Sequence, residues 1–191
     1  ETERLKSALT TSQSVRGRWG ELVLRNILIQ SELLPGVDFE EQSYAINDEG
    51  SRLKPDFVIR LPQSGQSLVI DSKTSLYESY FEAETTADNV ERKRLHSGFA
   101  ARMWERVTEL SSKDYQKHVS ESLPYVIMFI PSESALRAAF DSDPELFRKA
   151  MERKVFIASP ATIIPLILII GHGWRQHKMS KQAQELSKVV E

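Results

Sequence analysis

Two aspartates and a lysine are spaced so that one short hairpin would bring them together. Asp56 lies at the start of the apolar run PDFVIRL (55–61), and Asp71 and Lys73 end the run SLVIDSK (67–73). Side chains two residues apart on a strand share a face, so Asp71 and Lys73 point the same way. Carboxylate pairs bind Mg²⁺ or Mn²⁺, and a lysine beside them orients a metal-bound water. These residues indicate metal-dependent hydrolysis of a phosphodiester bond.

The segment between the two runs sets how the three residues meet. Only PQSGQ separates them, which predicts an antiparallel hairpin. A turn on its Ser-Gly pair places Asp56 opposite Lys73. The same turn places Val58 opposite Asp71. Every register in which partner numbers add to an odd sum keeps the two aspartates and the lysine on one face. The other face then carries an apolar layer made of Phe57, Ile59, Leu61, Leu68 and Ile70.

An amphipathic helix ahead of the hairpin supplies a third carboxylate. Residues 14–34 carry apolar side chains at helical spacing, and Pro35 and Gly36 end the pattern. Glu21 lies off the apolar stripe and is a candidate helper ligand or base, although Arg25, one turn later, is placed to pair with it instead. The main-chain carbonyl of Ser72 is a further candidate metal ligand.

Four other polar residues are candidates for contact with a nucleic acid. Arg16 and Arg18 precede Glu21 in the helix, and Lys54 precedes the Pro-Asp pair. Arginine and lysine suit contacts with phosphate, but solvent exposure at these positions explains them equally well. Gln42, at the start of a predicted strand, is a candidate for orienting substrate.

The order of elements predicts an α/β fold with a mixed β-sheet flanked by helices and a long C-terminal helix. The region from Lys73 to about Val119 reads as one or two helices, with a break around residues 85–88. Continuous apolar residues predict a buried strand at 124–131. The remaining predicted elements are a strand at 39–46, helices at 133–140 and 145–152, a strand at 154–159, and a helix that Ser159 and Pro160 begin.

Composition limits the classes of protein that remain. The chain has 191 residues, 25 basic and 27 acidic side chains, and a formal net charge of -2, so contact with a nucleic acid must depend on a local patch. The absence of cysteine excludes disulfides and thiolate metal sites. The longest apolar run, 163–170, is too short to cross a bilayer. Residues 1–13 read as a polar helical lead-in, the end of a coiled coil, and 14–191 as a single domain.

Several segments, in order, resemble one known family. They are RGRWGE (16–21), QSYAI (42–46), KPDFVIRLP (54–62), VIDSKTSLYESY (69–80), PYVIMFIPSESAL (124–136) and VFIASPATI (155–163). Together with Asp56 and the Asp71-x-Lys73 motif, they resemble the RmuC family within the PD-(D/E)xK nucleases, whose core is restriction-endonuclease-like. The resemblance covers nearly the whole chain after about residue 14.

The resemblance implies a magnesium-dependent deoxyribonuclease that acts in DNA recombination and limits rearrangement at inverted repeats. It places Asp56, Asp71 and Lys73 in the metal and catalytic roles, adds Glu21 as a further acidic ligand, and gives Gln42 a role in orienting DNA. No small-molecule cofactor is implied. Full-length relatives often carry an N-terminal membrane anchor and a coiled coil, which implies a cytoplasmic face for this domain and leaves homo-oligomers open. The C-terminal helix departs from the family pattern at Pro165, Gly171 and Gly173.

Three alternatives remain at this point. In the first, the aspartates flank turns and Lys73 is their surface ion partner, as is common for an arbitrary Asp-x-Lys. In the second, the chain is a DNA-structure-binding module that keeps a nuclease fold without turnover. In the third, it is a purely structural interaction domain. Assays for cleavage, metal binding and DNA binding separate these readings.

Overall fold

A computed structural model describes residues 13–42, 45–46, 52–53, 55–62, 64–72, 77–113, 115, 119 and 121–190. Its centre is a mixed five-stranded sheet in the order β1-β4-β5-β6-β7. Pairing is antiparallel from β1 to β5 and parallel from β5 to β7. The strands are β1 (Phe39–Glu41), β4 (Phe57–Arg60), β5 (Ser67–Ser72), β6 (Ser122–Phe129) and β7 (Val155–Ala158). The predicted α/β class is therefore confirmed.

The hairpin of β4 and β5 forms in a different register from the predicted one. Phe57 pairs with Ile70 and Val58 with Val69, so the predicted pairing of Val58 with Asp71 is wrong by two residues. The Leu61 N–H donates to the Gln66 carbonyl at 2.7 Å, which closes a longer loop than a two-residue turn. Gly65, with a φ of 70°, ends this loop instead of lying at its centre. The odd sum of partner numbers is kept, and the predicted apolar face with it.

The single strand predicted at 39–46 is two strands in two sheets. Beyond β1, the strands β2 (Ala45–Ile46) and β3 (Arg52–Leu53) form a separate antiparallel pair. The chain turns between β1 and β2 at Gln42, whose φ of 51° lies in the left-handed region that a regular strand cannot contain. The weak alternation of this segment gave no sign of that turn.

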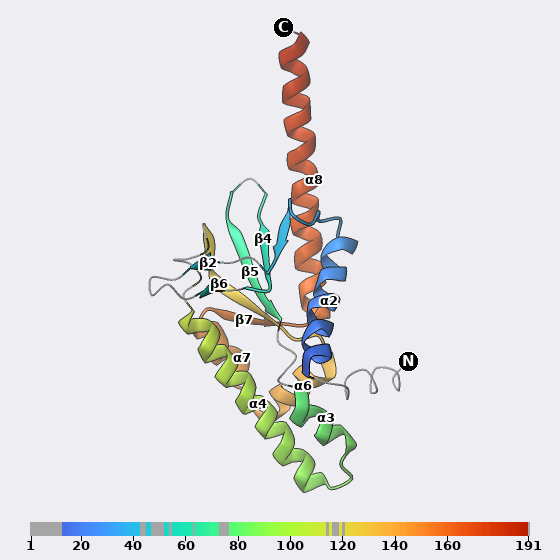
Figure 1. Cartoon of the computed structure of the whole chain (residues 1–191), viewed down its shortest axis with the longest axis vertical. Coiled ribbons are helices and arrows are strands. Elements are labelled where there is room, and N and C mark those ends of the chain that lie inside the picture. The colour runs from blue at the N-terminus through green and yellow to red at the C-terminus, as the bar shows by residue number, and fades with distance from the viewer. Residues whose placement is uncertain are drawn as a thin grey trace.

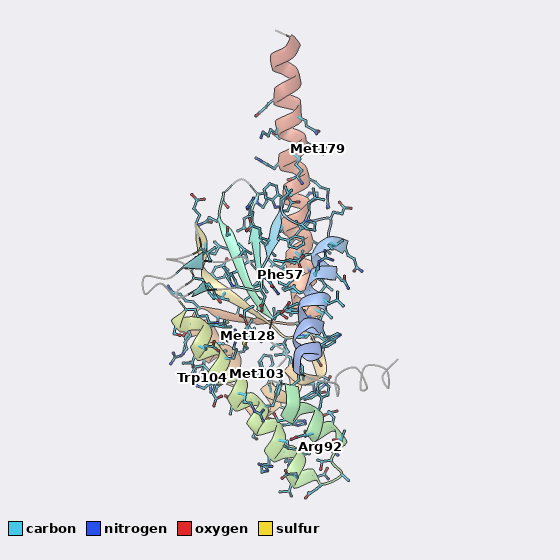
Figure 2. The ribbon with its side chains drawn as sticks, viewed as in Figure 1. Phe57, Arg92, Met103, Trp104, Met128 and Met179 are labelled. Carbon is cyan, nitrogen blue, oxygen red and sulfur yellow. The ribbon has the colours of Figure 1, made fainter. Side chains whose placement is uncertain are left out.

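Four helices cover one face of the sheet: α3 (Glu78–Thr85), α4 (Asn89–Ser112), α6 (Glu133–Ser142) and α7 (Leu146–Glu152) (Figure 1). The predicted break between the first two lies at residues 86–88, where the Asp88 carboxylate caps α4 by accepting the Val90 N–H. Met103 of α4 and Met128 of β6, labelled in Figure 2, belong to the same buried cluster on this face. The apolar face of α4 thus packs on the parallel strands.

Two helices cover the opposite face: α2 (Gln13–Gln30) and α8 (Pro160–Val190) (Figure 1). Phe57, Ile59, Leu68 and Ile70 of the hairpin pack beneath them, together with Leu24 and Leu28 of α2 and Ile163 and Ile167 of α8. The apolar layer predicted for one face of the hairpin is confirmed. Each hairpin strand therefore faces two different cores, and side chains that alternate along it enter one or the other.

The long helix α8 follows the predicted start at Pro160 and runs past the end of the sheet (Figure 1). Its two glycines mark close approaches. A Cβ on Gly171 would lie 2.6 Å from the Ser31 carbonyl oxygen, and one on Gly173 would lie 2.9 Å from Cγ of Pro62. Trp174 Nε1 then donates to the Arg60 carbonyl at 2.9 Å. The glycines let α8 lie against the end of α2 and the hairpin loop.

Within the described residues, none of the helices has the length and apolar content needed to cross a membrane.

Candidate functional site

Asp56 and Asp71 meet at one end of the β4–β5 hairpin. Phe57 pairs with Ile70, so one step further along the same register sets Asp56 opposite Asp71. The Ser72 N–H donates to Oδ2 of Asp56 at 2.7 Å, which fixes the Asp56 carboxylate against the neighbouring strand. The structure thus holds Asp56 against the strand that carries Asp71, in a register two residues away from the predicted one. Lys73 and Lys54 lie outside the described residues, so their roles stay predictions.

Asp71 is bound by an arginine that was not among the predicted site residues. Asp71 is 1% exposed, and its Oδ1 and Oδ2 both accept from Nη2 of Arg106, at 2.6 and 2.7 Å. Arg106 comes from α4 and is itself 6% exposed. Its Nη1 donates to the half-exposed Glu109 one turn later. Asp71 therefore forms a buried ion pair with the helix that covers the sheet.

A signal for Arg106 is present in the sequence. Phe99, Met103 and Leu110 are fully buried and lie on one stripe of α4, at spacings of four and seven residues. Arg106 falls on that stripe, three residues after Met103. Arginine is rarely buried without an acidic partner, so a lone arginine on an apolar stripe predicts a buried carboxylate opposite it.

The surroundings of the pair are polar but incompletely bonded. Burial alone would lower the pKa of Arg106, but the carboxylates of Asp71 and Glu109 outweigh burial and raise it. Burial, with the nearby Asp71 carboxylate, raises the pKa of Tyr115. Arg106 Nε, Tyr115 OH and Ser72 Oγ are buried and have no hydrogen-bond partner in the described part of the chain. The site keeps polar atoms whose hydrogen-bonding capacity is unused.

Glu21 reaches the site through Gln42. The Gln42 N–H donates to the Asp56 carbonyl at 2.8 Å, and its side-chain Nε2 donates to Oε2 of Glu21 at 3.3 Å. The predicted pairing of Arg25 with Glu21 is wrong, because Arg25 binds Glu41 of β1 at 2.8 Å. Glu21 is therefore free of Arg25, and one glutamine connects it to Asp56.

The two arginines predicted to contact DNA lie in the first two turns of α2. Arg16 and Arg18 precede Glu21 by five and three positions in the sequence. Their side chains fall outside the part of the structure that is described. Contact with DNA at these positions, as at Lys54, stays a prediction.

The donor types suit a hard divalent cation, but their arrangement includes a competitor. Asp56 lies against the strand that carries Asp71, and carboxylate oxygens are the ligands that Mg²⁺ and Mn²⁺ prefer. Both oxygens of Asp71, however, already accept from Arg106. Among the described residues, no three carboxylate or imidazole side chains gather as a metal-binding group. A cation held by the two aspartates would have to share Asp71 with Arg106.

The fold and site define a mixed α/β domain with paired carboxylates at the end of an antiparallel hairpin. The model of the RmuC family matches residues 1–191, and the chain belongs to this family. It is 37% identical over 190 residues to the DNA recombination protein RmuC of Salmonella typhimurium and, to the same extent, to that of Escherichia coli K12. It is 36% identical over 191 residues to the DNA recombination protein RmuC homolog of Vibrio cholerae.

These alignments cover 98% of the present chain but 39% of the Salmonella and Escherichia proteins and 36% of the Vibrio protein. The chain thus spans about two fifths of the length of these relatives. The names of these relatives support a role in DNA recombination for the family to which this domain belongs.

Proposed function

We propose that this domain hydrolyses DNA phosphodiester bonds with the help of a divalent cation, on a PD-(D/E)xK fold, as part of DNA recombination. The observation that carries the proposal is the hydrogen bond from the Ser72 N–H to Asp56, which sets the Asp56 carboxylate beside the strand that carries Asp71. Two adjacent carboxylates create a strong local negative charge that a divalent cation would neutralise. The names of the relatives, DNA recombination proteins, support DNA as the proposed substrate.

Each residue of the site receives one role in this proposal. Asp56 and Asp71 would hold Mg²⁺ or Mn²⁺, with the Ser72 carbonyl and Glu21 as further oxygen donors. A bound cation of this kind lowers the pKa of water and neutralises charge on a phosphate. Lys73, two residues after Asp71 in the sequence, would orient the attacking water and stabilise negative charge as it develops.

Gln42 takes a positioning role in place of direct contact with DNA. Its amide holds Glu21 while its main chain binds the Asp56 carbonyl. Arg16, Arg18 and Lys54 remain the proposed phosphate contacts, because their positions flank Glu21 and Asp56 in sequence and their charges suit phosphate oxygens.

Cleavage of supercoiled and linear DNA with Mg²⁺ or Mn²⁺ tests the proposal. We expect Asp56→Asn and Lys73→Ala each to lower the cleavage rate by about 10²–10³-fold, the cost of losing one group that stabilises the transition state. Circular dichroism would show that both variants fold. Asp141→Asn, at an aspartate with a 73% exposed side chain on α6, and Lys93→Ala, at an exposed lysine on α4, are the matched controls. Full cleavage by both site variants would refute the assignment.

A second candidate function is binding of DNA structures without turnover. The observation that favours it is the ion pair between Arg106 and Asp71, which already engages both carboxylate oxygens. This candidate expects the domain to bind hairpin or branched DNA equally well in chelator and in Mg²⁺, with no cleavage product after prolonged incubation. Gel-shift assays beside the cleavage assay distinguish the two functions.

A further inference from the structure

We infer that Arg106 is a positioning residue that holds Asp71 in the absence of metal and competes with a divalent cation for the same carboxylate. The inference rests on the proposed function, since it concerns the metal that Asp56 and Asp71 would bind. It adds a residue from α4 to a site otherwise built from the first helix and the hairpin.

The geometry of the contact is the first step. An arginine usually presents two nitrogens to a carboxylate, in two parallel hydrogen bonds. Here a single nitrogen, Nη2, donates to both oxygens of Asp71, at 2.6 and 2.7 Å. Nη1 is engaged by Glu109, and the buried Nε has no partner in the described residues. The pair is therefore close but not fully bonded, and a small rotation of the guanidinium would release one oxygen.

The charge balance is the second step. Asp56 immediately precedes β4 and Asp71 lies on the neighbouring β5, and like charges at neighbouring positions repel each other. Arg106 adds one positive charge beside Asp71, where burial makes an unpaired carboxylate costly. A divalent cation would supply the same compensation more strongly. It would also repel the guanidinium that lies against Asp71. Arg106 and the cation would thus each compensate the negative charge of the same two aspartates, one replacing the other.

The position of Arg106 in α4 is the third step. Met103, Val107 and Leu110 around it are at most 1% exposed, so the backbone at this point is held by packing on the sheet. Glu109, by contrast, has a 52% exposed side chain and offers the guanidinium a second acceptor toward solvent. The side chain therefore has an alternative partner within reach when it leaves Asp71.

Metal binding by Arg106→Gln and by the wild-type domain tests the inference. Titration with Mn²⁺ alone, followed by calorimetry, should show binding about tenfold tighter or more in the variant, because a nearby positive charge is removed. Thermal unfolding should show a lower Tm for the variant in chelator and recovery of most of that loss in saturating Mn²⁺. The double variant Asp71→Asn with Arg106→Gln should lose both effects. Unchanged Mn²⁺ affinity, or a loss of Tm that Mn²⁺ does not reduce, would overturn the inference.

Two further variants serve as controls. Arg106→Lys keeps the charge, so it should fold and bind Mn²⁺ nearly as weakly as wild type; tight binding by it would overturn the inference. Lys178→Gln removes the partly exposed cation that pairs with the buried Asp38, and should change Tm without any Mn²⁺ dependence. These readouts use no DNA. Absence of cleavage by a wild-type domain that binds Mn²⁺ would therefore refute the proposed function while leaving the competition to be decided by the affinities.

Discussion

Asp38 and Asp71 are both almost completely buried, yet they are neutralised in different ways. Asp38 accepts the Leu34 N–H at 3.0 Å and Lys178 Nζ at 3.2 Å, and the lysine side chain is 43% exposed. Asp71 instead depends on Arg106, which is also buried, with a side chain only 6% exposed. The first aspartate is bound to the main chain of its own turn. Among the described residues, the second is held by the Arg106 side chain, and a side chain can exchange for another cation.

The two aspartates also lie on different sides of the sheet. Lys178 extends from α8, and Arg106 from α4, which covers the opposite face (Figure 1). The pair on the α8 side fixes the long helix against the turn before β1. The pair on the α4 side lies at the proposed site. Variants that remove one cation at a time test whether this division between a structural and a functional aspartate is real.

The largest expected effect comes from removing the buried arginine. Arg106→Met leaves Asp71 charged and buried without a partner, and should lower the free energy of unfolding by about 3–5 kcal/mol in chelator. Urea unfolding monitored by tryptophan fluorescence measures this loss. The double variant Asp71→Leu with Arg106→Met removes both charges and should regain most of it. A loss below about 1 kcal/mol in the single variant would contradict the dependence of Asp71 on Arg106.

A smaller effect is expected where α8 approaches α2. Gly171→Ala places a Cβ 2.6 Å from a backbone oxygen that cannot move independently, and should lower the free energy of unfolding by about 1–3 kcal/mol. Gly173→Ala meets only the ring of Pro62 and should cost less. Thermal unfolding of the two variants side by side makes the comparison. Equal losses would show that the close approach at Ser31 does not fix α8.

The smallest effect is expected at Lys178. Lys178→Met should lower the free energy of unfolding by about 1 kcal/mol or less, because the lysine is partly in solvent and Asp38 keeps its hydrogen bond from Leu34. Asp38→Ala should cost more, since it also removes the acceptor of the Leu34 N–H. The same urea experiment applies. If Lys178→Met proves as damaging as Arg106→Met, the contrast between the two aspartates fails.

Sequence reasoning placed the two catalytic candidates on neighbouring strands, because strand alternation depends only on local geometry. Phe57, Ile59, Leu68 and Ile70 fill one core as that alternation requires, which leaves Asp71 on the other side. The exact register was missed because it depends on where the loop closes. A positive φ at Gly65 decides this, and a glycine in a loop permits several turns.

Local sequence patterns could not predict contacts between residues that lie far apart in the sequence. Nothing adjacent to Arg106 indicates Asp71, which lies 35 residues earlier. The same holds for Gly171 and Gly173, which read as departures from a family pattern until Ser31 and Pro62 are seen against them. Periodicity reports which side of a helix is buried. It does not report which neighbour the buried side will meet.

The backbone at Gln42 has a consequence for how the first helix is tied to the hairpin. A non-glycine residue at a φ of 51° carries about 1–3 kcal/mol of conformational strain, which a glycine would relieve. Glycine would also delete the amide that holds Glu21. The chain therefore keeps a strained backbone at Gln42, because the glycine that would relieve the strain would also remove the side chain that holds Glu21.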